Sequence, residues 1–185
     1  MKRIFLTLCL AVGFMASWAQ VDAKYAAGKV PVLNGRVTFQ DTIATTLSPE
    51  AAYAKVSAWA KERFNKPNVI ISKFITDDAR NCQLNFTAEE YLVFTNRFFV
   101  LDRTRINYWM EMKSIDNGIV LKLTRINYWY EEEREGGLKF SAEDMITDEN
   151  AFNRKGKMLK VQGKFRRKTI DFFEDCVMQI SKALS

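Results

Sequence analysis

The stretch TRINYWMEMKSIDNGIVLKLTRINYWY, residues 104–130, decides the fold that this sequence predicts. Two runs rich in Ile, Tyr, Trp and Thr flank Asp116-Asn117-Gly118. Asn-Gly is a preferred two-residue turn between antiparallel strands, and these residue types are typical of strands. We therefore expect a β-hairpin made of residues 104–115 and 119–130.

The register of this hairpin decides which side chains share a face of the sheet. An Asn-Gly turn centre places Ile106 opposite Trp129, and Trp109 opposite Ile126. Strict alternation then assigns Ile106, Tyr108, Met110 and Trp129 to the core face, and Arg105, Trp109, Tyr128 and Tyr130 to the other face. An uncovered face of this kind could bind a peptide, a glycan or a partner protein. Alternatively, the basic segment described below and a short helix near residue 141 could cover it.

The hexapeptide Thr-Arg-Ile-Asn-Tyr-Trp occurs twice in this hairpin, at residues 104–109 and 124–129. One duplicated hexapeptide is too short to indicate a solenoid repeat. One interpretation is a functional repeat. The second is that the copies occupy matched positions in the sheet, or match by chance, in a strand composition biased toward these residues. Because strands strongly select Ile, Tyr, Trp and Thr, the second interpretation is favoured.

The rest of the chain predicts helices packed on a largely antiparallel sheet. Residues 36–45 alternate as a half-buried strand, and Ser48-Pro49-Glu50 begins a helix that runs to about residue 65. Further strands are expected at 69–76, 82–86 and 91–101, a short helix at 141–152, a basic connecting segment at 154–168, and a closing helix at 170–184. This order predicts an α+β fold with the helices on one face of the sheet.

The first nineteen residues have the features of a signal peptide. Lys2-Arg3 precedes an apolar run at residues 4–16, and Ser17-Trp18-Ala19 supplies small residues before a cut after Ala19. The apolar run is too short to span a bilayer, which needs about 20 residues. We therefore expect residues 1–19 to be removed on export; an uncleaved anchor or a buried helix is the alternative.

Residues 20–185 are then expected to form a single domain, with a C-terminal extension at about 141–185. The domain would be periplasmic, in the outer envelope or secreted, and would not span a membrane. The formal net charge of +6 falls to +4 when Lys2 and Arg3 are removed. This mild excess does not call for a nucleic-acid partner, and none is expected.

Histidine is absent from the sequence. This excludes Ser-His-Asp and Cys-His nucleophile systems, the usual zinc sites and the commonest general base near neutral pH. Asp77, Asp78 and Asp144 could act as acid/base carboxylates, but nothing in the sequence fixes two of them in space. We expect no enzyme activity, no metal and no cofactor.

Two cysteines remain after processing, Cys82 and Cys176. Export permits a disulfide between them, whereas two buried free thiols are the alternative. Cys82 alternates with Leu84 and Phe86 on the expected core face, which favours a buried thiol.

Two charged runs are candidate ligand sites. The basic run contains Arg154, Lys155, Lys157, Lys160, Lys164, Arg166, Arg167 and Lys168 with no acid between them. It could bind a phosphorylated lipid or an acidic glycan, or it could be a solvated loop. The acidic run contains Glu131, Glu132, Glu133 and Glu135. It could bind calcium, form a solvated strand end, or pair with the basic run.

Several segments resemble an exported Gram-negative family of unknown function with a TBP-like fold, DUF4468. They are residues 30–37 (VPVLNGRV), the Ser-Pro-started helix with Ala58-Trp59-Ala60 and Arg63-Phe64, and residues 116–121, 142–148 and 163–172. The resemblance covers most of residues 30–184. It implies a curved sheet with helices behind it and an envelope location, and it assigns no catalytic residues. TBP-like describes the fold and implies no DNA binding.

Taken together, these features predict a non-enzymatic, exported binding or interaction module of the cell envelope. The expected ligand-binding residues are Arg105, Trp109, Tyr128 and Tyr130 on the sheet face and Lys164, Arg166 and Arg167 at a basic rim. The partner would be an envelope protein, a peptide, a glycan or an anionic lipid. The alternatives are a structural accessory domain of an envelope assembly and, least favoured, a hydrolase that uses carboxylates alone.

Overall fold

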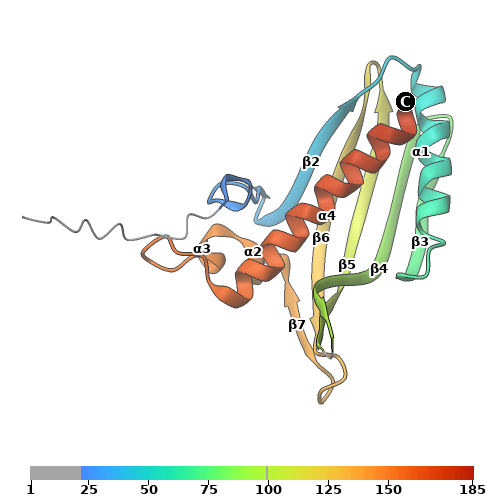
Figure 1. Cartoon of the computed structure of the whole chain (residues 1–185). Helices are drawn as coiled ribbons and strands as arrows, with labels where there is room; N and C mark the ends of the chain where they lie inside the picture. Colours follow the sequence, from blue (N-terminus) through green and yellow to red (C-terminus); the bar gives the residue numbers. More distant parts are fainter. Residues whose placement is uncertain (1–21, 99) are drawn as a thin grey trace, which may run out of the picture.

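A seven-stranded antiparallel sheet with helices on one face accounts for most of residues 22–98 and 100–185, the part of the chain that this computed structural model describes (Figure 1). The expected signal peptide at residues 1–19 lies outside the described residues. The α+β class and the mainly antiparallel curved sheet are confirmed. No helix in the described ranges is long and apolar enough to cross a membrane.

The elements follow one another with short connections. In chain order they are η1 (Ala23–Tyr25), β1 (Val32–Leu33), β2 (Arg36–Ala44), α1 (Pro49–Arg63), β3 (Val69–Asp78), β4 (Gln83–Arg97), β5 (Val100–Ile115), β6 (Gly118–Tyr130), β7 (Leu138–Ser141), α2 (Ala142–Ile146), α3 (Asp148–Ala151) and α4 (Lys160–Leu184). The strands lie in the order β1-β2-β6-β5-β4-β3, and β7 also pairs with β6. Strand β2 pairs with the first half of β6, and β7 pairs with its last four residues.

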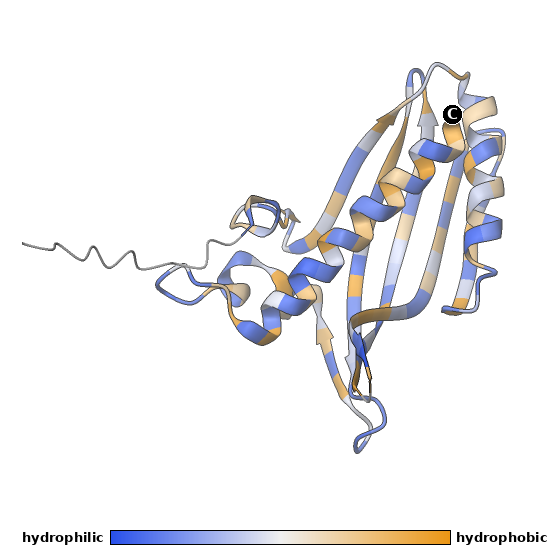
Figure 2. Cartoon of the chain, in the orientation of Figure 1, coloured by the Kyte–Doolittle hydropathy of each residue, from blue (hydrophilic) through white to orange (hydrophobic). Residues whose placement is uncertain are grey.

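The core lies between the sheet and helices α1 and α4. Helix α1 begins as expected, because the Ser48 side chain accepts a hydrogen bond from the backbone N–H of Ala51 at 3.3 Å. Phe64 at its end packs on Phe86 of β4, with ring centroids 4.4 Å apart. Helix α4 crosses the same face, and Phe173 packs on Phe39 of β2. The strands alternate between hydrophobic and hydrophilic residues along their length (Figure 2).

Helix α4 begins at Lys160, ten residues before the predicted start at Ile170. The prediction of a basic connecting segment over residues 154–168 is therefore wrong for its second half. Lys, Arg and Gln are good helix formers, so the basic composition does not oppose a helix. Phe165 within this segment is fully buried, and its burial attaches the first turns of α4 to the sheet.

The predicted strands at residues 82–86 and 91–101 are one long strand, β4, and the beginning of β5. Residues 93–97 pair with residues 100–103, and neither segment pairs with another strand, because β3 begins opposite Glu90 and β6 ends opposite Thr104. They form a two-stranded arm beyond the sheet, visible in Figure 1 at the lower ends of β4 and β5.

The hairpin of β5 and β6 exists, but its predicted register is wrong. Ile115 pairs with Gly118, so the turn centre is Asp116-Asn117, and Asn117 has a φ of 68°. A bulge then adds one residue to β6, because Trp109 pairs with Thr124 whereas Asn107 pairs with Asn127. The backbone of Arg125 accommodates the bulge with a φ of 53°.

Because of the bulge, the last four residues of the two copies of the hexapeptide have the same orientation. In each copy the Thr, Ile and Tyr side chains are buried, and the Arg, Asn and Trp side chains point to the face away from the helices. The isoleucine, asparagine, tyrosine and tryptophan of the two copies therefore occupy matched sheet positions.

A buried ion pair lies in the core beside the first copy. Arg63 of α1 donates two hydrogen bonds to the Glu90 carboxylate, at 2.9 and 3.1 Å, and the Tyr108 hydroxyl donates a third at 2.6 Å. Asn68 donates to the same carboxylate at 3.0 Å. The sequence analysis did not identify this network, because a charged residue is not expected at a core-facing strand position.

Cys82 and Cys176 are both buried free thiols, so the structure contains no disulfide between them. Cys82 lies just before β4, and Cys176 lies on the inner face of α4. Burial raises the pKa of the Cys176 thiol to about 12, so the thiol is protonated at neutral pH.

Candidate functional site on the open sheet face

The face of the sheet that carries Arg105, Asn107 and Trp109 is not covered by any helix within the described ranges. Helices α1, α2 and α4 pack on the opposite face, and α3 packs on α2 and α4 (Figure 1). The basic residues and the short helices near residue 141 therefore do not cover this face. We call it the open face.

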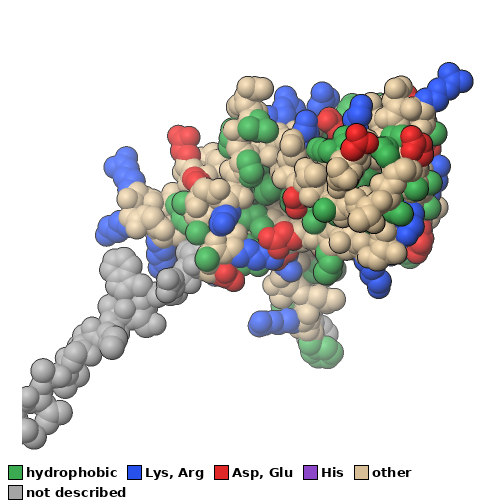
Figure 3. All heavy atoms as spheres, turned by 90° about the horizontal axis from the view of Figure 1, so that it is seen from above, with side chains coloured by type: hydrophobic (Ala, Val, Ile, Leu, Met, Phe, Trp, Pro, Cys, Tyr) green, Lys and Arg blue, Asp and Glu red, His purple; other side chains and the backbone are tan. Residues whose placement is uncertain are grey.

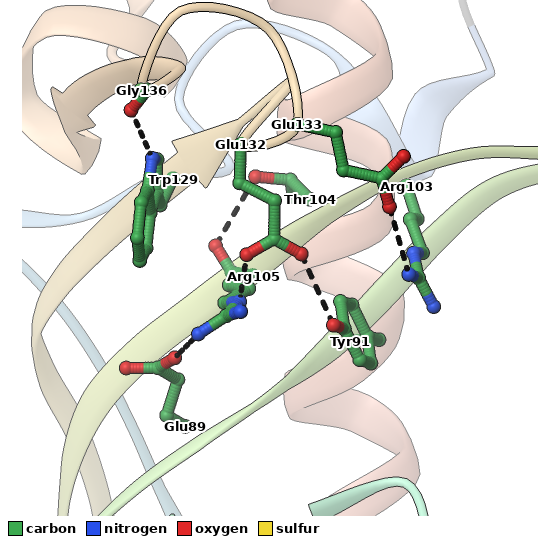
Figure 4. A network of polar contacts seen from close by, with 9 residues as sticks. All are labelled: Glu89, Tyr91, Arg103, Thr104, Arg105, Trp129, Glu132, Glu133 and Gly136. Atoms are coloured by element: carbon green, nitrogen blue, oxygen red, sulfur yellow. Dashed lines mark hydrogen bonds and ion pairs between the residues drawn. The ribbon is translucent and has the colours of Figure 1, made fainter. Parts of the chain in front are cut away.

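Arg105 of β5 is the centre of a polar network on the open face (Figure 4). Its Nη1 donates to Glu89 of β4 at 3.0 Å, and its Nε pairs with Glu132 of the β6–β7 loop. Tyr91 donates to the same Glu132 carboxylate at 3.1 Å. Although burial opposes the charged form, the hydrogen bond to Glu89 and the charge of Glu132 raise the pKa of the Arg105 guanidinium. Its orientation is therefore fixed by two carboxylates.

Trp129 lies beside Arg105 and is also held in place. Its indole Nε1 donates to the backbone carbonyl of Gly136 at 2.8 Å, which closes the β6–β7 loop over it (Figure 4). The guanidinium carbon of Arg105 is 4.8 Å from the ring centroid, and the Lys139 ammonium is 4.9 Å from it. Both are cation–π distances.

The second copy of the hexapeptide makes the reciprocal contact. The guanidinium carbon of Arg125 lies 4.2 Å from the centroid of the Trp109 ring. Each arginine of one copy is thus placed over the tryptophan of the other. Asn107 and Asn127 pair directly between the two contacts.

A groove of about 530 Å³ lies on this part of the open face. It is lined by Glu89, Arg105, Asn107, Asn127, Trp129 and Lys139, with Phe140 and Ser141 of β7 at one side. A second hollow of about 490 Å³ lies between the arm and the β6–β7 loop, on the other side of Arg105 and Trp129. Arg105 and Trp129 therefore line both hollows.

Of the residues predicted for this face, Tyr128 is misplaced. Because of the bulge it points into the core, where its hydroxyl is 2.7 Å from that of Thr169 in α4. Burial raises the pKa of the Tyr128 phenol. Trp129, which was predicted for the core, takes its place on the open face.

Tyr130 and Lys164 are brought together, but on the helix side of the sheet. The Lys164 ammonium donates to the Tyr130 hydroxyl at 2.8 Å and to Asp102 at 2.9 Å, and the Tyr130 hydroxyl donates to Asp102 at 3.0 Å. Although burial opposes the charge, these hydrogen bonds raise the pKa of Lys164. The cluster attaches the base of the arm to α4.

Arg166 does not lie at an exposed rim, because its side chain is fully buried. It donates to the backbone carbonyls of Tyr25 at 3.0 Å and Ile146 at 2.6 Å, and it pairs with Asp148 at 2.8 Å. Burial lowers the pKa of its guanidinium, but an arginine stays charged. The predicted role of Arg166 in a surface patch is therefore replaced by a role in joining three segments.

Arg167 is exposed, and its Nη1 is 3.1 Å from the sulfur of Met158. It lies on α4 and therefore on the side of the sheet opposite the open face. Figure 3 shows lysine and arginine side chains spread over the view from above, with acidic side chains among them. The predicted basic rim of the aromatic face is thus not formed.

The acidic run joins the open-face network instead of the basic run. Glu132 binds Arg105, Glu133 lies 3.7 Å from Arg103, and Glu131 lies 3.4 Å from Arg134. Within the described residues, no three acidic, histidine or cysteine side chains are grouped so that they could hold a metal ion.

Comparisons with known proteins agree with this architecture. Residues 39–129 match the family model described as a domain of unknown function (DUF4468) with TBP-like fold. A crystal structure of a DUF4468 family protein from Bacteroides ovatus is similar with a TM-score of 0.80 and 28% sequence identity, covering 90% of this chain and 96% of that one. A crystal structure of a TBP-like protein from Parabacteroides distasonis is similar with a TM-score of 0.69 and 22% identity, covering 84% of this chain and 96% of that one. The comparison with curated proteins gives no match.

The match covers the part of the chain that builds most of the candidate site, including both copies of the hexapeptide. Helix α1, strands β3 to β5 and all of β6 except Tyr130 lie within it. By sequence over residues 39–129 and by fold over most of its length, the chain is similar to proteins with the DUF4468 domain, a domain of unknown function with a TBP-like fold.

Proposed function

We propose that this protein is an exported, non-enzymatic binding module whose ligand occupies the groove on the open face. The observation that carries the proposal is a solvent-facing groove of about 530 Å³ whose polar lining is held in place by contacts within the protein. Binding sites combine a concave surface with a few positioned polar groups.

The lining is preorganised, which reduces the entropy lost on binding. Arg105 is held by Glu89 and Glu132, and Trp129 is held by its hydrogen bond to Gly136. Asn107, in contrast, makes no side-chain hydrogen bond to another described residue. Its amide is therefore available to a ligand as both donor and acceptor.

Export is the second part of the proposal. It rests on the basic start, the short apolar run and the small residues before Ala19. The mass of the mature protein tests it directly, since cleavage after Ala19 leaves residues 20–185.

The test of binding is native mass spectrometry of the protein recovered gently from its own host. We expect added mass from a retained ligand in the wild type, and its loss in Asn107→Ala. Gln40→Ala is the matched control, because Gln40 is an exposed polar residue of the same face on β2, outside the groove. Retention of the same ligand by Asn107→Ala, with unchanged melting, would contradict the groove as its site.

A second candidate function is supported by the arm. Val93, Val100 and Leu101 are 38%, 54% and 56% exposed there. Exposed apolar side chains on a projecting element favour contact with another protein, and hence an accessory domain of an envelope assembly. In that case crosslinking in the host would capture a partner through the arm, and Leu101→Ser would abolish the crosslink while Asn107→Ala would not.

A further inference from the structure

The duplicated hexapeptide gives the open face two similar half-sites. One half-site is built around the Arg105–Trp129 contact, and the other around the Arg125–Trp109 contact. The Asn107–Asn127 pair lies between them on neighbouring antiparallel strands. Each half-site therefore presents a tryptophan ring with the arginine of the other copy over it.

The chemistry of the groove selects the class of ligand. Its lining offers donors and acceptors side by side: the two asparagine amides, the Glu89 carboxylate and the Lys139 ammonium. A hydroxyl group both donates and accepts, so a polyhydroxylated ligand can satisfy this mixture. A purely apolar ligand would leave these polar groups unpaired, which is costly.

The charges of the two half-sites refine this choice. Arg105 is neutralised by Glu89 and Glu132. Arg125 and Lys139 are both exposed, and neither lies within ion-pair distance of a carboxylate in the described part of the chain. Each is instead placed over a tryptophan ring, Arg125 over Trp109 and Lys139 over Trp129. These two cations can pair with anionic groups of a ligand.

We propose that the ligand is an acidic oligosaccharide that lies across both half-sites. Its hydroxyl groups bind the Asn107–Asn127 pair and Glu89, and its carboxylates bind Arg125 and Lys139. This inference rests on the proposed function of the groove, and it adds the class of the ligand. It also adds a minimum length of more than one sugar, because Trp129 lies opposite Arg105, which is four residues, or about 13 Å, along β5 from Trp109.

A panel of purified oligosaccharides tests the inference by native mass spectrometry and calorimetry. It contains uronic-acid tetrasaccharides and hexasaccharides, the corresponding disaccharides, and the carboxyl-reduced form of each. We expect at least one acidic tetrasaccharide or hexasaccharide to bind about tenfold more tightly than its reduced form and its disaccharide. Arg125→Gln and Lys139→Gln should each weaken that binding about tenfold.

Lys113→Gln is the control, because it removes one exposed positive charge from the same face of β5 at the end far from the groove. Loss of binding in this control equal to that in Arg125→Gln would overturn the two-half-site model in favour of general charge attraction. Equal binding of acidic and reduced sugars would overturn the acidic part of the inference while leaving the groove as a binding site. Binding of no sugar in the panel, together with an Asn107-dependent ligand of another class from the host, would overturn the inference and support the proposed function. Absence of both would overturn the two together.

Discussion

The two copies of Thr-Arg-Ile-Asn-Tyr-Trp have identical sequences and the same pattern of burial, but they have different partners. Tyr108 of the first copy donates to Glu90, which belongs to a buried ion pair, whereas Tyr128 of the second copy meets the neutral hydroxyl of Thr169. Arg105 is held by two carboxylates, whereas Arg125 is exposed. The same pattern of burial thus occurs with different partners, and the neighbouring elements determine the energetic roles of the buried side chains.

The largest difference between the copies is expected from Glu90→Gln. The variant keeps the shape of the side chain but leaves the buried Arg63 guanidinium without a counter-charge, so we expect a loss of about 3 kcal/mol in the free energy of unfolding. The counterpart in the second copy, Thr169→Val, removes one neutral hydrogen bond from Tyr128 and should cost about 1 kcal/mol. Urea unfolding measures both values. Equal losses would show that the charge adds nothing to the first copy.

The second-largest loss of stability is expected from a change beside Trp129, the tryptophan of the second copy. Gly137→Ala should cost about 2 kcal/mol, because Gly137 has a φ of 71° and an added Cβ would lie 2.6 Å from Nε1 of Trp129 and 2.8 Å from the carbonyl oxygen of Tyr130. Gly136→Ala is the control: its φ of 86° is also positive, but an added Cβ meets no atom within 4 Å. In residues 20–185 with Trp59→Phe and Trp109→Phe, Trp129 is the remaining tryptophan, and its fluorescence should change in the first variant more than in the second. The same change in both would mean that backbone strain alone alters the loop.

A smaller difference is expected between the two arginines. Arg105→Gln leaves Glu89 and Glu132 near each other without their cation, so we expect a loss of about 1 kcal/mol. Arg125→Gln removes an exposed side chain and should change stability by less than about 0.5 kcal/mol. Thermal unfolding at low and high salt is the measurement, and salt should reduce only the Arg105 effect. A larger loss for Arg125 would contradict the assignment of partners.

The buried tyrosine of each copy is expected to have no pH-dependent effect on stability at neutral pH. Its effect on the free energy of unfolding should become measurable only at alkaline pH. Burial raises the pKa of both the Tyr108 and Tyr128 phenols. In the unfolded chain these phenols ionise near pH 10, whereas in the folded chain they stay protonated. Stability is therefore unaffected at pH 7 and should fall as the pH rises above about 10, because ionisation favours the unfolded state. Unfolding free energies measured between pH 8 and 11 test this, and a flat profile would show that both phenols ionise in place.

Much of the architecture could be predicted from the sequence because it depends on local signals. The Ser48-Pro49 helix start and the alternation of Cys82, Leu84 and Phe86 gave elements that the structure contains. Continuing that alternation along β4 also places Glu89 and Tyr91 on the open face, so this part of the site could have been found.

The misplaced residues follow from features without a local signal. The bulge at Arg125 requires a positive φ, which is usual for Gly or Asn and uncommon for Arg, and it exchanged Tyr128 and Trp129 between the faces. Arg166 was assigned to the surface because charged residues are seldom fully buried. Its partners, the carbonyls of Tyr25, Ala26 and Ile146, are distant in sequence, so no local pattern reveals them.

The contacts of Arg166 also mean that the start of the domain can reach its final structure only after α4 has been synthesised. Its partner Ala26 precedes it by 140 residues, so the first residues of the domain cannot be fastened until the start of α4 has been made. At synthesis rates of about 5–20 residues per second, that delay is roughly 7–28 s. During this interval the backbone carbonyls of Tyr25 and Ala26 lack the hydrogen bonds that Arg166 supplies. Helix α4, the last helix to be synthesised, thus holds residues near the start of the domain in place through Arg166.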